Sequence, residues 1–215
     1  MDAQAVPKRV VVAISGSTGS IYGIRLLQVL KDTPEVETHL IISPAAKRTL
    51  IHETDFTIKE VEALGGVVYD YRDIGAAPAS GSFHTMGMIV APCSIKTMSA
   101  LATCYADNLI TRAGDVTLKE GRPLIVVLRE TPLHAGHLRM MLQLAEMGAV
   151  MLPPMPAFYN RPKTVDDIVN HTVGRMLDRI GLPFHGLFKE WRGTRPAATP
   201  RGAGAGDRGA EGIDD

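Results

Sequence analysis

Hydrophobic residues along this chain follow two alternating spacings. Short apolar runs rich in β-branched residues, such as residues 10–14 and 124–128, are typical of strands buried on both faces of a parallel sheet. Between such runs, hydrophobic residues recur every three or four positions, which is the spacing of helices that pack on a sheet. The alternation continues through residues 8–192 and predicts a single doubly wound α/β domain of the Rossmann or flavodoxin type, with a mostly parallel sheet.

Turn and capping residues divide this pattern into elements. Thr57, with Glu60 three residues later, is a capping-box signature, and Thr164 precedes a helix whose first turn is acidic. We therefore predict strands at residues 10–14, 36–43, 67–71, 86–91, 124–128 and 149–152, and helices at residues 21–30, 45–52, 58–64, 95–102, 107–120, 134–147 and 165–180.

One loop and one helix differ in character from the other predicted segments. Residues 76–83 are small and show no periodicity, so we expect a loop there. The helix predicted at residues 134–147 is amphipathic. Its apolar face consists of Leu138, Met141, Leu142 and Ala145.

Composition limits the classes of function. The chain has 215 residues, and its 23 Lys and Arg residues balance its 23 Asp and Glu residues. A net charge of zero argues against a general binder of nucleic acid or membrane surfaces. We expect no secretory leader and no membrane span, and two cysteines without zinc spacing favour the reducing cytoplasm. Residues 193–215 are mainly Gly, Ala, Pro and charged residues with almost nothing apolar, so we expect that segment to be disordered.

The first strand is followed by a glycine-rich loop, SGSTG, at residues 15–19. Free backbone N–H groups and the positive end of the next helix favour an anion or a polar ring edge there. Gly16, Gly19 and Gly23 do not match the dinucleotide fingerprint, and Ser43 stands where an NAD site needs an acidic residue. A P-loop is also excluded, because no Gly-Lys-Ser/Thr follows. A turn with glycines for packing alone remains the alternative.

Further polar residues follow other strands. Ligands of doubly wound sheets bind at the carboxyl ends of strands, which makes these positions candidates. Ser94 and Thr97 place hydroxyl groups at the start of a second helix. For a single helix, N-capping by Ser94 would explain such a hydroxyl group, but here two helix starts carry them. Arg129 and Glu130 follow the most apolar strand. Arg129 suits a phosphate or carboxylate and Glu130 suits proton transfer, whereas a structural ion pair between them is the alternative.

Other side chains are weaker candidates. Arg175 lies near the apolar face of the last helix, where an arginine needs an anion from a ligand or an acidic side chain. Glu53 is explained most simply as a surface or capping residue. Cys93 precedes a helix start, where a lowered thiol pKa is possible, but no base is recognisable and we interpret it as a buried small residue. The remaining candidates for an anion pocket are Lys119, Arg112 and Tyr159. A metal site at His134 and His137 would lack a third ligand.

Six motifs together are far more specific than any one of them. They are ISGSTGSIYGIRLL (14–27), SGSF (80–83), VAPCSIKT (90–97), ADNLITRAGDVTLKE (106–120), RETPL (129–133) and LPPMPAFYNRP (152–162). Over roughly residues 8–191 the chain resembles the UbiX/Pad-type flavin prenyltransferases. The resemblance implies an enzyme that transfers a dimethylallyl group from dimethylallyl monophosphate to N5 and C6 of reduced FMN without a metal. It also implies a homo-oligomer, typically a dodecamer with active sites at subunit contacts, and a separate UbiD-type decarboxylase that receives the prenylated FMN.

The resemblance further implies roles for individual residues. Two departures from many relatives are visible: Thr18 adds a methyl group close to flavin N5, and residues 74–78 lack an aromatic residue that some relatives carry before SGSF. The implied FMN-binding residues are Gly16, Ser17, Thr18, Ser43, Ser94, Ile95, Lys96, Thr97 and Arg129; the implied prenyl-phosphate-binding residues are Lys119, Arg129, Tyr159 and Arg175; and the implied catalytic residues are Glu130, Glu53 and Thr18.

Three other functions are open at this point. A flavin-dependent cysteine decarboxylase should carry a histidine base and a cysteine-bearing lid, and no matching lid is recognisable. A non-catalytic flavin carrier would not need the second anion site that Lys119, Tyr159 and Arg175 suggest. A purely structural α/β oligomer would leave the hydroxyl groups at the strand ends unexplained.

Overall fold

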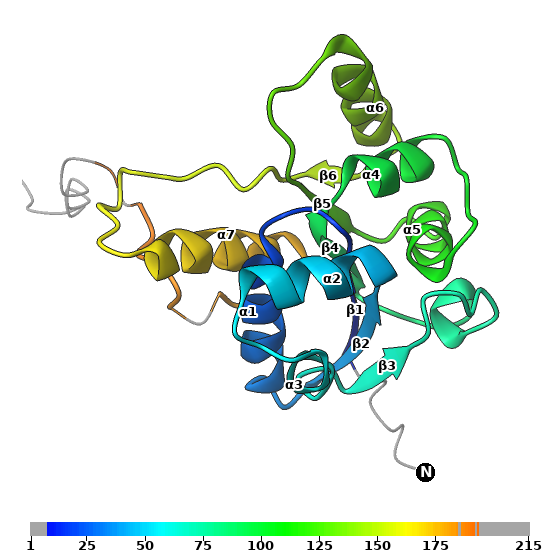
Figure 1. Cartoon of the computed structure of the whole chain (residues 1–215), viewed down its shortest axis with the longest axis horizontal. Coiled ribbons are helices and arrows are strands. Elements are labelled where there is room, and N and C mark those ends of the chain that lie inside the picture. Colours follow the sequence, from blue (N-terminus) through cyan, green and yellow to red (C-terminus); the bar gives the residue numbers. More distant parts are fainter. Residues whose placement is uncertain (1–7, 185, 192, 194–215) are drawn as a thin grey trace, which may run out of the picture.

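The fold is a six-stranded parallel sheet with helices on both faces (Figure 1). The computed structural model describes residues 8–184, 186–191 and 193. The strands are β1 (Lys8–Ile14), β2 (Val36–Ile42), β3 (Val67–Tyr69), β4 (Gly87–Cys93), β5 (Leu124–Leu128) and β6 (Val150–Met151). The helices are α1 (Ser20–Lys31), α2 (Pro44–Glu53), α3 (Ile58–Glu62), the 3₁₀ turn η1 (Ala77–Ala79), α4 (Ile95–Ala102), α5 (Leu109–Lys119), α6 (Ala135–Glu146) and α7 (Val165–Arg179).

Strand β1 shows how the two helical layers share the core. Val10 and Val12 point to a cluster that includes residues of α1, α2 and α7. Val11 and Ala13 point to the opposite cluster, to which α4 and α5 contribute. Strands β4 and β5 are buried at every position, as expected for central strands covered on both sides. The prediction of a doubly wound α/β domain is therefore confirmed, and every strand pair is parallel.

The strand order locates the edge at which a ligand can bind. The order is β3-β2-β1-β4-β5-β6, so the chain proceeds outward from β1 in one direction and from β4 in the other. The loops that follow β1 and β4 diverge at this point and leave a crevice at the carboxyl ends of the two strands. This topology places residues 15–19 beside residues 94–97.

Three local features differ from the sequence-based expectation. Strand β4 continues through Pro92 to Cys93, with an irregular register after Val90. The segment 76–83, expected as a loop, contains the turn η1. On α6 Met141 packs partly buried against the core, but the rest of the predicted apolar face points outward: Leu138 is 53% exposed and Leu142 is 59% exposed.

The orientation of α6 has a simple packing reason. This helix contacts the rest of the chain through buried Leu144 and through Gln143, whose Nε2 donates to the Ala102 carbonyl oxygen at 2.6 Å. Periodicity reveals that a helix has an apolar face, but it does not reveal which surface covers that face.

Among the described residues, no helix has the length and apolarity required to cross a bilayer.

Candidate functional site

Ser15 joins the two loops at the centre of the sheet edge. Its side chain is buried, and its Oγ donates to the Pro92 carbonyl oxygen at 3.1 Å. The backbone N–H of Ser94 donates to Ser15 Oγ at 2.7 Å. The sequence did not single out Ser15, although its place directly after a buried strand was a usable signal. These bonds fix the loop after β1 against the start of α4.

Two serines cap the helices that begin at this edge. Ser94 Oγ accepts from the Thr97 backbone N–H at 3.3 Å, and Ser43 Oγ accepts from the Ala46 N–H at 3.1 Å. The structure thus brings together five of the predicted flavin-binding residues around one hollow of about 390 Å³. Its lining is Gly16, Ser43, Pro44, Ala45, Arg48, Tyr71, Ser94, Lys96 and Thr97, of which Pro44, Ala45, Arg48 and Tyr71 were not among the predicted site residues.

The glycines of the first loop have mainly packing roles. A Cβ on Gly16 would lie 2.3 Å from Ala45 Cβ, and one on Gly23 would lie 2.3 Å from the Ala91 carbonyl oxygen. Gly19 adopts φ +95°, a conformation that favours glycine. Packing therefore requires glycine at positions 16 and 23, and Gly16 also lines the hollow. Ser17 Oγ, by contrast, is buried without a hydrogen-bond partner among the described residues, so it fits a polar group of a bound ligand.

Glu53 lies against the start of α1. Its Oε2 accepts from the backbone N–H groups of Gly19 at 2.9 Å and Ser20 at 3.1 Å. Burial acts to raise the pKa of Glu53, but hydrogen bonds from the Thr18 side chain and from these N–H groups outweigh it, and the pKa is lowered. Glu53 is therefore a carboxylate at neutral pH and caps α1, whose own N-cap residue Gly19 has no side chain to do so.

Arg129 and Glu130 do not form the structural ion pair considered above. The Glu130 carboxylate is exposed and accepts from the Thr131 N–H at 3.0 Å. The Arg129 backbone N–H donates to the Cys93 carbonyl oxygen at 3.1 Å, next to the start of α4. Burial raises the pKa of the Tyr22 phenol and the Arg129 charge opposes that rise, so the guanidinium lies near α1. Among the described residues no carboxylate pairs with Arg129, which leaves it available to an anion.

Tyr159 and Arg175 both lie near His171 of α7. Tyr159 Oη lies 2.9 Å from Nε2 of His171, and Arg175 follows His171 by one helical turn. The anion expected beside Arg175 is Asp178, at 3.3 Å, but Arg175 is 47% exposed and the pair is weak enough to exchange for a ligand. A hollow of about 370 Å³ opens here. It is lined by His171, Thr172, Arg175 and Arg179 of α7 and by Val150, Met151, Leu152, Pro153 and Met155.

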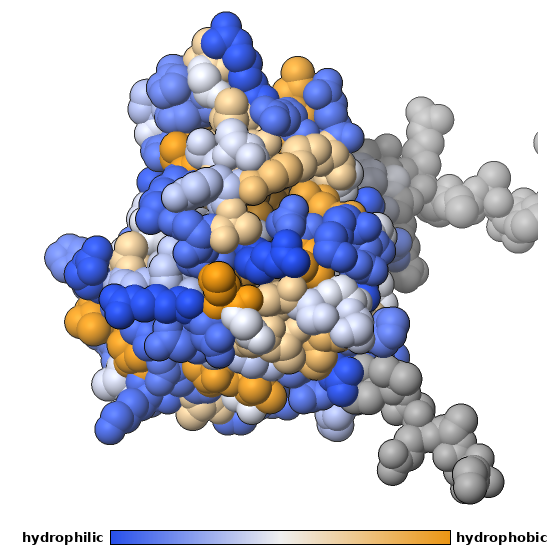
Figure 2. Space-filling view, turned by 90° about the vertical axis from the view of Figure 1, so that its right-hand side faces the viewer, coloured by the Kyte–Doolittle hydropathy of each residue, from blue (hydrophilic) through white to orange (hydrophobic). Residues whose placement is uncertain are grey.

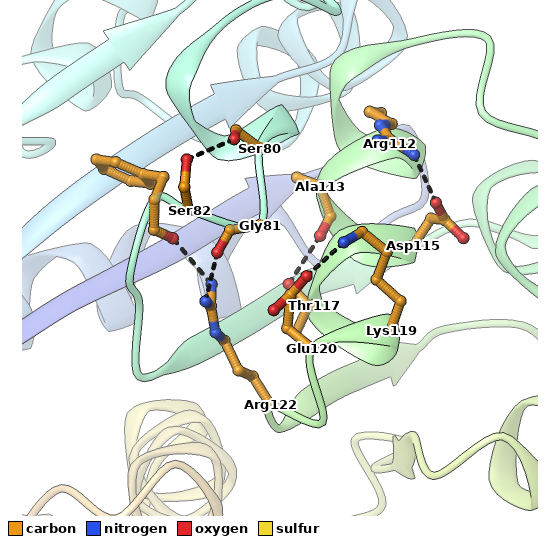
Figure 3. Close-up of polar contacts among 11 residues, drawn as sticks. Ser80, Gly81, Ser82, Arg112, Ala113, Asp115, Thr117, Lys119, Glu120 and Arg122 are labelled. Carbon is orange, nitrogen blue, oxygen red and sulfur yellow. Dashed lines mark hydrogen bonds and ion pairs between the residues drawn. The ribbon is translucent and has the colours of Figure 1, made fainter.

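Lys119 lies apart from the other candidates for the prenyl phosphate. It ends α5 and forms an ion pair with Glu120, beside Gly81 (Figure 3). The chain then enters β5 at its amino end, whereas Arg129 follows the carboxyl end of that strand. A strand of five residues spans roughly 17 Å. Within one chain, Lys119 therefore lies at the amino ends of the strands and Arg129 at their carboxyl ends.

The contacts of the remaining candidates are explained by the fold itself. Arg112 pairs with Asp115 on its own helix at 2.8 Å. Burial raises the pKa of the Cys93 thiol, so the possibility of a lowered pKa is wrong and Cys93 is a buried small residue. The rings of His134 and His137 lie against each other at an interplanar angle of 32°, with centroids 3.6 Å apart. Within the described part of the chain, no three His, Cys, Asp or Glu side chains lie close enough to hold a metal ion.

Comparison with known proteins identifies the family. A family model named Flavoprotein matches residues 2–177. The flavin prenyltransferase UbiX of Escherichia coli K12 is 56% identical over 187 residues, covering 86% of this chain and 99% of the relative.

Two solved structures are similar over their full length. One is a dodecameric FMN-dependent UbiX-like decarboxylase from Escherichia coli O157:H7, with 50% identity, a TM-score of 0.84 and coverage of 86% of this chain. The other is AnUbiX (PadA1) in complex with FMN and dimethylallyl pyrophosphate, with 45% identity, a TM-score of 0.85 and coverage of 88% of this chain. Both alignments cover 100% of the solved chain. The chain belongs to the UbiX family of flavin prenyltransferases.

Proposed function

We propose that this chain transfers a dimethylallyl group from dimethylallyl monophosphate to N5 and C6 of reduced FMN. The observation that carries the proposal is the sheet edge, where Ser15 ties two hydroxyl-bearing helix starts together beside Arg129. Membership of the UbiX family supports the reaction class. A solved relative that binds FMN together with a dimethylallyl ester supports the two substrates.

We assign the flavin half of the site to groups that follow the carboxyl ends of β1, β2, β4 and β5. Ser17, with its unpartnered buried hydroxyl, would donate to or accept from the flavin ring. Thr18 extends the same loop, next to the Glu53 carboxylate. The phosphate and ribityl groups need donors, which the start of α4 and Arg129 offer. The full proposed set is Gly16, Ser17, Thr18, Ser43, Ser94, Ile95, Lys96, Thr97 and Arg129.

The phosphate half assists departure of the leaving group. Breaking the C–O bond of an allylic phosphate develops negative charge on the phosphate and positive charge on the allyl group. Lys119, Arg129 and Arg175, with the Tyr159 hydroxyl, stabilise the developing phosphate charge. A closed site keeps water from the allylic group. The proton released on ring closure needs an acceptor, and Glu130 at the sheet edge is the proposed one.

Oligomerisation completes the proposed site. Within one chain, Lys119 and Arg129 lie at opposite ends of β5. A single phosphate can therefore contact both residues only if another subunit supplies one of them. The outward face of α6 with Leu138 and Leu142 needs a cover, and Figure 2 shows further hydrophobic groups interrupting one hydrophilic surface. The dodecameric relative supports a homo-oligomer, and we propose a dodecamer with sites at subunit contacts.

Two finer points belong to the same proposal. A separate UbiD-type decarboxylase would receive the prenylated FMN, and both proteins would work in the cytoplasm, where the free thiols of Cys93 and Cys104 stay reduced. A cysteine decarboxylase and a flavin carrier are not favoured, because the chain is 56% identical to a flavin prenyltransferase over 86% of its length.

The direct test is product formation. Purified protein would be mixed with reduced FMN and either dimethylallyl monophosphate or dimethylallyl pyrophosphate, and the flavin would be analysed by mass spectrometry. The proposal expects a flavin heavier by one prenyl unit, formed faster from the monophosphate. An unchanged flavin with both donors would reject the proposed function, and product from the pyrophosphate alone would reject the proposed donor.

A further inference from the structure

His171 is a buried titratable residue to which no role has been assigned so far. It lies on the inner side of α7 with 9% of its surface exposed. Its Nε2 is 2.9 Å from Tyr159 Oη, and the two rings meet edge to face with centroids 5.7 Å apart. The histidine therefore connects the rigid helix to the proline-rich loop that carries Tyr159.

Aromatic rings cover the histidine side of this hydrogen bond, while Tyr159 itself is 52% exposed. Gly174 allows this cover, since a Cβ there would lie 2.5 Å from the ring of Phe188. Phe188 can thus lie against α7, where its ring centroid is 4.7 Å from that of His171. Trp191 meets the Tyr159 ring from another direction, with centroids 5.8 Å apart. A hydrogen bond to a buried imidazole holds its partner more firmly than one made entirely in water, and the exposed side of the Tyr159 hydroxyl stays open to a ligand.

The direction of the hydrogen bond decides what Tyr159 can do. A phenol has a single hydrogen to donate, and its oxygen can accept at the same time. A phenol that gives its hydrogen to His171 has none left for a phosphate. A phenol that accepts from the Nε2–H of His171 keeps its hydrogen for an anion on its other side.

We propose that His171 is a positioning residue, which donates its Nε2–H to Tyr159 Oη and thereby directs the phenol hydrogen at the phosphate of the prenyl donor. The inference rests on the proposed function for the role of Tyr159. Arg175, one turn along the same face of α7, would contact the same phosphate.

The charge distribution around His171 agrees with a neutral donor. Burial lowers the pKa of His171, and the positive charge of Arg175 lowers it further. The imidazole is therefore neutral at neutral pH, so it must exist as one of two tautomers. Only the tautomer with hydrogen on Nε2 can donate to Tyr159, and the proposal requires that one.

The first test compares four variants with wild type: His171→Leu, His171→Gln, Tyr159→Phe and the double variant His171→Leu with Tyr159→Phe. We would measure affinity for dimethylallyl monophosphate by calorimetry and kcat/KM for prenylation. Loss of one hydrogen bond is worth roughly 3- to 10-fold, so His171→Leu should weaken donor binding by about that factor and leave FMN affinity unchanged. His171→Gln retains an N–H donor and should be close to wild type.

The double variant separates positioning from simple packing. If His171 acts through the Tyr159 hydroxyl, the double variant should be no worse than Tyr159→Phe alone. Additive losses, or a Gln variant as weak as the Leu variant, would overturn the proposal. Donor calorimetry gives this answer even if no prenylated flavin forms, so failure of the proposed function and failure of this inference remain distinguishable.

A second measurement needs no variant to be active. Nitrogen NMR of protein labelled with ¹⁵N-histidine reports the tautomer directly, and the His171→Gln spectrum assigns the signal among the seven histidines of the chain. A neutral ring protonated on Nε2 is expected at neutral pH. A ring protonated on Nδ1 alone would overturn the proposal, because it could only accept from Tyr159.

Discussion

The two halves of the proposed site are built in different ways. In the flavin half, the loops after the neighbouring strands β1 and β4 are tied by hydrogen bonds of Ser15 within one chain. In the phosphate half, Lys119 and Arg129 lie at opposite ends of β5, and Tyr159 with Arg175 belongs to the region of α7. Sheet topology therefore suffices to organise the flavin half, whereas the phosphate half as we propose it requires residues from more than one chain.

The largest expected effect is on proton transfer in the phosphate half. Glu130→Gln retains size and hydrogen-bonding reach but cannot accept a proton, so product formation should slow by roughly 10²- to 10⁴-fold while FMN and donor still bind. Rapid mixing with reduced FMN and donor, followed by absorption spectra, should reveal a flavin joined to the prenyl group by one bond. A weakened donor affinity without that species would show that Glu130 only orients Arg129. A wild-type rate would remove Glu130 from the mechanism.

A somewhat smaller effect is expected from the cation on α7. Arg175→Ala should lower turnover by about 10²- to 10³-fold, since one charge-assisted contact to the leaving phosphate is lost. FMN affinity should not change, because Arg175 belongs to the phosphate half alone. Asp178→Asn is the matched control: it removes the 3.3 Å intrachain partner of Arg175 and should leave turnover within a few-fold of wild type. Loss of flavin from Arg175→Ala would contradict the separation of the two halves.

The contrast between the two halves also explains what the sequence could reveal. Strand ends of a doubly wound sheet converge on one edge, so Ser43, Ser94 and Thr97 could be placed around one hollow from periodicity and topology alone. Ser15 was overlooked because its role depends on the hydrogen bonds it makes across the crevice. The packing roles of Gly16 and Gly23 depend on neighbours that only the folded chain supplies.

Interactions between distant segments were harder to predict. The sequence placed Lys119 in one pocket with Tyr159 and Arg175 by family resemblance, but no pattern in a single sequence tells which subunit provides a residue. The exposure of the apolar face of α6 was unpredictable for the same reason, because an amphipathic pattern does not identify the surface that packs against it. The burial that raises the Cys93 thiol pKa agrees with the interpretation of Cys93 as a buried small residue, but its cause, the continuation of β4 to Cys93, could not be read from the local sequence.

A smaller effect, on stability, should sharpen the description of the flavin half. Glu53→Gln should destabilise the fold by about 1 kcal/mol, as loss of a helix N-cap does. The folded-state pKa of Glu53 is lower than its ordinary value of 4.5, so the ionised form stabilises the protein. The difference in melting temperature between variant and wild type should be full above pH 4.5 and disappear as pH falls through the folded-state pKa. The exposed Glu146→Gln is the control, and a pH-independent difference for Glu53→Gln would contradict the capping role.

The smallest effect is expected at the end of the chain. Residues 194–215 lie outside the described residues, and the composition of residues 193–215 predicts a segment too polar to form a core. A chain ending at Arg192 should keep its melting temperature, oligomeric state and activity, and it retains Trp191 beside Tyr159. Calorimetry and light scattering would check this. Dissociation of the oligomer on truncation would make the segment part of the assembly.

The most direct test of the shared site is complementation between two inactive variants, Lys119→Ala and Glu130→Gln. Both chains, with different tags, would be co-expressed, isolated as mixed oligomers by successive affinity steps and assayed for prenylated FMN. If each site takes Lys119 from one subunit and Glu130 from another, random mixing restores about a quarter of the sites, and activity should reach about a quarter of the wild-type value. Activity no higher than the mean of the two pure variants would show that one chain supplies both residues and would contradict the account.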